Sequence, residues 1–204
     1  MTPFPLPRPA RIAVLASGRG SNLEALLRAF PAGDPVGEVR LVISNRASAA
    51  ALAKAQAAGV EARHIPFRDP QAFAADAMQA LDDAGIDLVC LAGFMRILPP
   101  SFVRRYQGRL LNVHPSLLPA FRGLQAQRQA LDAGVRETGC TVHFVDEGVD
   151  TGGIIVQRRV PVLDGDTEET LAERIRAEEH RAFPDAVRLV LSGRATPATA
   201  EVRP

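Results

Sequence analysis

The 204-residue sequence contains no tryptophan, one tyrosine and only two cysteines. Cys90 and Cys140 lie far apart in apolar segments, without the neighbouring cysteines or histidines that zinc sites need. We therefore expect two buried, reduced thiols and no metal site. The sequence also lacks an excess of one charge, since 24 basic and 23 acidic residues leave a formal net charge of +1. This balance predicts no broad basic surface for nucleic acid or for an anionic membrane.

Long apolar segments are missing as well. No stretch approaches the roughly 20 residues needed to span a bilayer, and the proline-rich N-terminus has no apolar core of signal-peptide length. Hydrophobic residues make up 47% and charged residues 23%, as is usual for globular proteins. We expect a cytoplasmic protein with one enzyme-sized domain over residues 11–191, a flexible proline-rich leader over 1–10 and a C-terminal tail over 192–204.

The first half of the chain alternates between apolar segments, expected as strands, and segments with helical spacing. The expected strands are residues 11–16, 39–44, 60–65 and 86–92, and the expected helices are residues 21–30, 47–58 and 70–84. Strands that are apolar on both faces and alternate with helices predict a parallel sheet covered by helices.

The second half has a different spacing. A strand at 109–114 and a helix at 123–133 precede two strands, 139–145 and 153–160, which are too close together for a helix between them. They therefore indicate neighbouring antiparallel strands, before a long final helix at 167–191. The whole pattern predicts a single Rossmann-like α/β domain of three layers, with a mostly parallel sheet and an antiparallel strand in the C-terminal half.

A glycine-rich segment, Ser17-Gly18-Arg19-Gly20-Ser21-Asn22, follows the first expected strand and opens the first helix. Backbone N–H groups and the helix dipole bind phosphate at such a position. A dinucleotide site would need a third glycine where Leu23 stands, and a nucleoside triphosphate site would need a Walker lysine. The segment therefore favours a phosphate monoester. A capping box between Ser21 and Glu24 is an alternative that explains those two residues but not the glycines.

Two polar residues stand out in the apolar strand at 109–114. Asn112 and His114 are two positions apart, so their side chains share one face of the strand, near the edge where open α/β sheets bind ligands. An amide donor beside an imidazole suits a developing oxyanion, and a nearby carboxylate could hold the imidazole protonated. Asp150, in a glycine-rich loop, is the candidate carboxylate. The alternative is that backbone groups satisfy both polar side chains.

Five segments of the chain together resemble the folate-dependent formyltransferase family. They are SGRGSNL (17–23), LAGFMRIL (91–98), LLNVHPSLLP (110–119), VHFVDEGVDTGGII (142–155) and EEH (178–180). The resemblance implies transfer of the formyl group of 10-formyltetrahydrofolate, without a metal, to the amine of glycinamide ribonucleotide in purine biosynthesis. It also implies small-molecule partners and no nucleic acid or membrane, in a monomer or homodimer.

The resemblance carries over residue by residue to the expected site. As catalytic residues it implies Asn112, His114 and Asp150, with Asn112 and a protonated His114 stabilising a tetrahedral intermediate and Asp150 keeping His114 charged. The implied ribonucleotide-binding residues are Gly18, Arg19, Gly20, Ser21, Asn22 and Glu179. The implied folate-binding residues are Met95, Arg96, Ile97, Leu98, Asp146, Glu147, Gly148 and Val149.

Glu179 has support of its own, because it falls on the apolar stripe of the final helix. That stripe is formed by Leu171, Ile175, Phe183 and Val187, at spacings of four residues. A carboxylate that faces inward needs a partner, since an unpaired buried charge is costly. The alternative is that the stripe drifts and leaves Glu179 in solvent.

The sequence departs from the family pattern after Pro119, where Arg122 and Gln125 replace the usual proline and histidine of the ribonucleotide enzymes. Arg122 is similar to the methionyl-tRNA branch, which normally carries an additional basic domain. Formyltetrahydrofolate deformylase, sugar-nucleotide N-formylation and a non-catalytic nucleotide- or folate-binding module are further alternatives.

Overall fold

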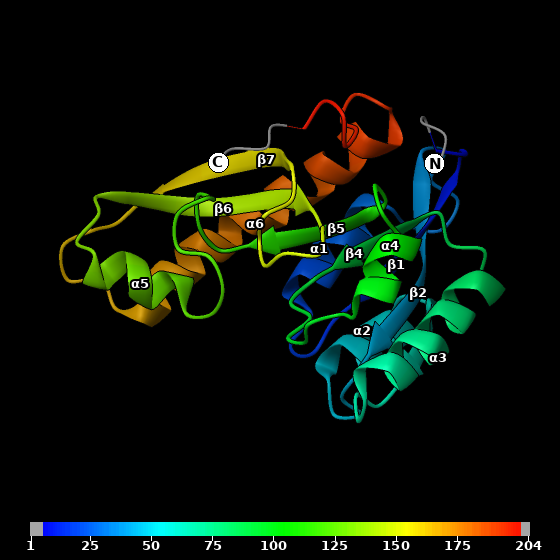
Figure 1. The fold of residues 1–204 in the computed structure, drawn as a ribbon. Coiled ribbons are helices and arrows are strands. Elements are labelled where there is room, and N and C mark those ends of the chain that lie inside the picture. Colours follow the sequence, from blue (N-terminus) through cyan, green and yellow to red (C-terminus); the bar gives the residue numbers. More distant parts are fainter. Residues whose placement is uncertain (1–5, 201–204) are drawn as a thin grey trace.

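The computed structural model describes residues 6–200. In this range a single seven-stranded sheet is covered by helices on both faces (Figure 1). The strands are β1 (Ala10–Leu15), β2 (Gly37–Ser44), β3 (Glu61–His64), β4 (Leu88–Leu91), β5 (Leu110–His114), β6 (Glu137–Phe144) and β7 (Ile154–Pro161). The helices are α1 (Ser21–Ala29), α2 (Ala50–Ala57), α3 (Pro70–Asp83), α4 (Pro100–Arg105), α5 (Ala126–Asp132) and α6 (Glu168–Leu191).

The strand order is β3-β2-β1-β4-β5-β6-β7. Strands β1 to β5 pair in parallel, whereas β6 runs antiparallel to both β5 and β7. The mostly parallel three-layer α/β fold expected from the sequence is therefore confirmed. Helix α4 was not predicted, because six residues are too few to show a helical period; Pro100 in its first turn is the one local signal.

Two apolar cores lie on opposite faces of the sheet. Helices α1, α2 and α6 pack on one face, and α3 and α4 pack on the other. The expected stripe of α6 is buried, since Leu171, Ile175, Phe183 and Val187 are at most 1% exposed. Cys90 on β4 and Cys140 on β6 belong to the first core, and burial raises the pKa of both thiols, that of Cys140 to about 12.

Packing extends to both sides of the expected domain limits. Leu6 is only 3% exposed and Ala10 begins β1, while Ala195 and Ala200 pack on the first core. Residues 1–5 and 201–204, which fall in the expected leader and tail, lie outside the described residues. Within residues 6–200, no helix has both the length and the apolar character needed to cross a membrane.

Candidate active site

The expected site residues gather at one edge of the sheet. Strands β1, β4 and β5 are consecutive in the sheet and parallel, so their carboxyl ends meet at this edge. The order of the strands reverses between β1 and β4, which is the position where open α/β folds bind ligands. Two inter-strand spacings separate the loop after β1 from the end of β5, or about 10 Å. The edge therefore suits a small, extended substrate.

The glycine-rich loop enters α1 through Gly20, whose φ of 72° lies in the left-handed region. A Cβ at Gly20 would come within 3.0 Å of Ala51, so the close packing of α2 also requires glycine here. The alternative of a capping box is wrong, because Gly20 is the N-cap, no side chain caps the helix, and Glu24 pairs with Lys54. The first N–H groups of α1 are thus left without a side-chain cap, as an anion site requires.

Asn112, His114 and Asp150 come together at the end of β5. Asp150 Oδ2 lies 3.2 Å from His114 Nδ1, and Asp150 Oδ1 lies 3.5 Å from Asn112 Nδ2. On its other side, His114 Nε2 donates to the carbonyl of Phe121 at 2.8 Å. His114 is only 5% exposed, while Val113 packs in the core on the opposite face. Both nitrogens of the His114 ring therefore face oxygen acceptors.

Burial and the neighbouring groups have opposite effects on the pKa values of Asp150 and His114. Burial alone would raise the pKa of Asp150, but the imidazoles of His143 and His114 and the N–H of Gly123 outweigh it, so the pKa lies below its ordinary value. Burial lowers the pKa of His114, and the opposing effects of Asp150 and the Phe121 carbonyl do not restore it. Asp150 is therefore ionised at neutral pH.

The expectation that Asp150 keeps His114 protonated stays a prediction, because two effects on the pKa of His114 oppose each other. Asp150 does raise the pKa of His114, but desolvation is the larger effect and favours the neutral ring. Two acceptors nevertheless face the ring, so an imidazolium would be fully hydrogen-bonded once formed. The two acceptors therefore favour an imidazolium, whereas burial opposes it.

Glu179 faces α1 rather than solvent. Its Oε2 accepts a hydrogen bond of 2.8 Å from Asn22 Nδ2, which joins α6 to the start of α1 beside the glycine-rich loop. Burial raises the pKa of Glu179, and the Asn22 donor and Arg176 act in the opposite direction. Asn22 Oδ1 is buried without a partner in the described residues. A carboxylate and an amide oxygen without a partner thus lie beside the glycine-rich loop.

The residues expected to bind folate form two loops on one apolar base. Val145, which precedes the loop of Asp146 to Asp150, packs on the cluster that contains Phe94 and Leu98. Met95, Ile97 and Val149 are 62%, 78% and 53% exposed. Exposed apolar side chains on both loops are suited to covering a flat aromatic ligand. An ion pair of 3.0 Å between Arg104 on α4 and Glu147 links the second loop to the domain.

One site residue was missed by the sequence analysis. His143 on β6 pairs across the sheet with Asn112, and its ring is buried at 2% exposure. Its Nε2 lies 3.2 Å from Asn112 Nδ2 and 3.5 Å from Asp150 Oδ1, and its Nδ1 lies 2.7 Å from the carbonyl of Phe144. A histidine in an otherwise apolar strand was the available signal, but the register between β5 and β6 was needed to place it.

Comparisons with known proteins show the family of the chain. The sequence profile described as Formyl transferase matches residues 10–187. The chain belongs to the formyl transferase family. The Escherichia coli K12 protein named phosphoribosylglycinamide formyltransferase is 43% identical over 186 residues, covering 90% of this chain and 88% of that protein. The crystal structure of glycinamide ribonucleotide transformylase 1 from Symbiobacterium toebii has a TM-score of 0.86 and 51% identity, covering 91% and 89% of the two chains.

Some relatives of this formyl transferase are much longer. The bovine trifunctional purine biosynthetic protein adenosine-3 is 51% identical over 190 residues, which are 92% of this chain but 19% of the bovine protein. The chain therefore spans about a fifth of that relative. Formyl transferases of this family use 10-formyltetrahydrofolate as co-substrate.

The loop that departs from the family pattern lies directly on the catalytic residues. Besides the contact of Phe121 with His114, the N–H of Gly123 donates to Asp150 Oδ2 at 2.9 Å. Phe121, Gln125 and Asp150 all have left-handed backbones, with φ of 56°, 59° and 53°. Such conformations are costly outside glycine and occur mainly at functional sites. The side chains of Arg122 and Gln125 are exposed, so the formyl transferase holds this loop through its backbone.

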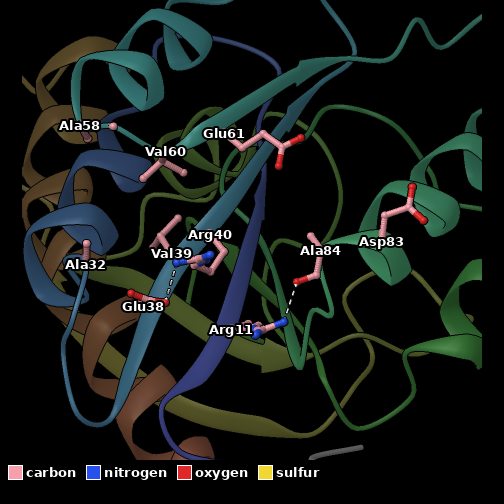
Figure 2. A pocket seen from close by; sticks show the side chains of 11 residues that line it. Arg11, Ala32, Glu38, Val39, Arg40, Ala58, Val60, Glu61, Asp83 and Ala84 are labelled. Carbon is pink, nitrogen blue, oxygen red and sulfur yellow. Dashed lines mark hydrogen bonds and ion pairs between the residues drawn. The ribbon is translucent and has the colours of Figure 1, made fainter.

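A cavity in the described residues lies away from the site. It encloses about 420 Å³ at the opposite edge of the sheet, where it is lined by Arg11, Arg40, Glu61 and Asp83 (Figure 2). Its charged side chains already have partners: Arg40 pairs with Glu38, and Arg11 donates to the Ala84 carbonyl. Among residues 6–200, no three histidine, cysteine or acidic side chains are grouped to hold a metal ion.

Proposed function

We propose that this protein transfers the formyl group of 10-formyltetrahydrofolate to the amine of glycinamide ribonucleotide. The observation that carries the proposal is the contact of Asn112, His114 and Asp150 at the same sheet edge as an uncapped, glycine-led helix start. Family membership and the named activity of the Escherichia coli relative, 43% identical over 88% of its length, support it.

In the proposed arrangement the phosphate binds at Gly18, Arg19, Gly20, Ser21 and Asn22, and Glu179 accepts hydrogen bonds from the ribose. The folate lies between the Met95–Leu98 loop and the Asp146–Val149 loop. The substrate amine then reaches the end of β5, about 10 Å from the phosphate loop. Binding energy from the phosphate thus positions an amine at the catalytic residues.

The proposed chemistry is acyl transfer through a tetrahedral intermediate. The amine nitrogen forms a bond to the formyl carbon, and the carbonyl electron pair becomes an oxyanion stabilised by the Asn112 amide and the His114 ring. The amine gives up a proton, with the ionised Asp150 or a water beside it as acceptor, and N10 of the folate takes a proton as its bond to carbon breaks. An oxyanion at His114 Nε2 takes the place of the Phe121 carbonyl.

Turnover of a 10-formylfolate analogue, followed by absorbance with and without glycinamide ribonucleotide, tests the proposal. Folate product that appears only with the ribonucleotide supports it. Release without any amine would indicate deformylase chemistry, and absence of release in both reactions would contradict the proposal. A cytoplasmic location and a monomeric or homodimeric state stay predictions from the sequence.

A further inference from the structure

His143 is a buried, titratable side chain that the proposed chemistry does not use. It lies beneath Asn112 on the neighbouring strand, and cross-strand partners in an antiparallel pair share one face of the sheet. Strand β7 carries one extra residue opposite the step from Val142 to His143, a bulge that locally increases the twist. Bulges of this kind often occur beside active sites and re-aim a side chain.

The contacts of the His143 ring indicate which of its two nitrogens carries the hydrogen. A backbone carbonyl only accepts hydrogen bonds, so the contact of 2.7 Å to the Phe144 carbonyl requires a hydrogen on Nδ1. In the neutral ring Nε2 then carries a lone pair. The nearest donor to that lone pair is Asn112 Nδ2, at 3.2 Å.

This lone pair decides which way the Asn112 amide points. With Nδ2 toward His143 and Asp150, one amide hydrogen meets the His143 lone pair, and the second has only the long contact of 3.5 Å to Asp150. After a flip, Asn112 Oδ1 would face two acceptors, the His143 lone pair and the Asp150 carboxylate. The flipped amide would thus lose its hydrogen bonds and offer no donor to an oxyanion.

We propose that His143 is a positioning residue for the formyl transfer: by accepting a hydrogen bond at Nε2, it fixes the Asn112 amide with its second N–H free for the developing oxyanion. The inference rests on the proposed function. His143 does not touch the reacting atoms and acts through Asn112.

A matched pair of variants tests the acceptor. A glutamine side chain places its terminal amide near the position of the imidazole Nε2, whereas the shorter asparagine reaches only the position of Nδ1. We expect His143→Gln to keep kcat within about threefold of the wild type. His143→Asn should lower kcat roughly tenfold, the order expected for one hydrogen bond, with the KM of the ribonucleotide unchanged.

A double-mutant cycle separates positioning from a structural role. In an Asn112→Ala background, His143→Asn should change kcat by less than twofold, because the amide that it positions is gone. An equal tenfold loss in both backgrounds would overturn the inference, and so would equal losses in His143→Gln and His143→Asn. Thermal unfolding of each variant shows which losses come from the fold.

The tautomer gives a readout that does not depend on activity. In protein labelled with ¹⁵N at histidine, we expect the His143 ring to carry its hydrogen on Nδ1 and none on Nε2. A ring with hydrogen on Nε2 would overturn the inference even if the wild type is fully active. Conversely, wild-type protein that transfers no formyl group would contradict the proposed function, while this spectrum would still report the His143 proton.

Discussion

The two sides of the site edge are built in different ways. On the side of the proposed phosphate site, which we call the phosphate side, the residues from Gly18 to Asn22 are consecutive, and they form a helix start whose geometry depends on one glycine. On the catalytic side, Asn112, His114, His143 and Asp150 come from two strands and a loop, and each acts through its side chain. In a continuous loop, one residue can be substituted without moving the others. The catalytic side depends on the register between strands, so a shift of one strand would move several side chains together.

The largest expected effect would come from the catalytic side. Asn112→Ala removes one oxyanion donor, and we expect kcat to fall by roughly 10²–10³. The KM of the ribonucleotide should change little, since the phosphate loop lies about 10 Å away. Steady-state kinetics with both substrates varied measures both constants. A loss below tenfold in kcat would contradict the oxyanion role.

A smaller effect is expected where the two sides meet, at Glu179. Glu179→Gln keeps an oxygen that can accept from Asn22 but removes the charge, and we expect the KM of the ribonucleotide to rise about tenfold with kcat nearly unchanged. An analogue without ribose hydroxyls should bind wild type and variant alike. Equal KM values for the normal substrate would leave Glu179 without a role in binding.

On the phosphate side, a matched pair of glycine substitutions tests the loop. Gly20→Ala forces a side chain into a left-handed backbone against Ala51, and we expect it to lower the free energy of unfolding by about 1–2 kcal/mol. Gly18→Ala enters open space, and we expect a change within about 0.5 kcal/mol. Denaturant unfolding measures both. Similar losses in the two variants would show that the Gly20 conformation is not what the loop depends on.

The smallest expected effect concerns the charge of Asp150. Asp150→Asn removes the carboxylate that raises the pKa of His114, so we expect His114 to titrate at a lower pH in the variant, as followed by NMR of its ring protons. The pKa of Asp150 is lowered on folding, so its carboxylate stabilises the folded protein above the ordinary value of 3.8. The stability advantage of the wild type over the variant should therefore shrink as the pH falls below 3.8. An advantage that grows in acid would contradict this assignment.

The sequence predicted most where structure is local. The alternation of strands and helices, the glycine-rich loop before α1 and the buried stripe of α6 all follow from periods and neighbouring residues. Asp150 was named as the candidate carboxylate, but its contact with His114 could not be derived from spacing. The 35 residues between them include α5 and β6, and the sequence does not show how β6 pairs with β5. His143 and the left-handed Phe121 were missed for the same reason, and the lowered pKa of His114 depends on burial that no spacing reveals.

The two buried cysteines can report separately on the opening of the strands that carry them. Cys90 lies on β4 and Cys140 on β6, and both thiols stay protonated and shielded while their strands are packed. A thiol reagent consequently labels each one only during the moments when its own strand opens. Labelling rates at the two positions, separated by peptide mass, would reveal whether β4 and β6 open together or in turn.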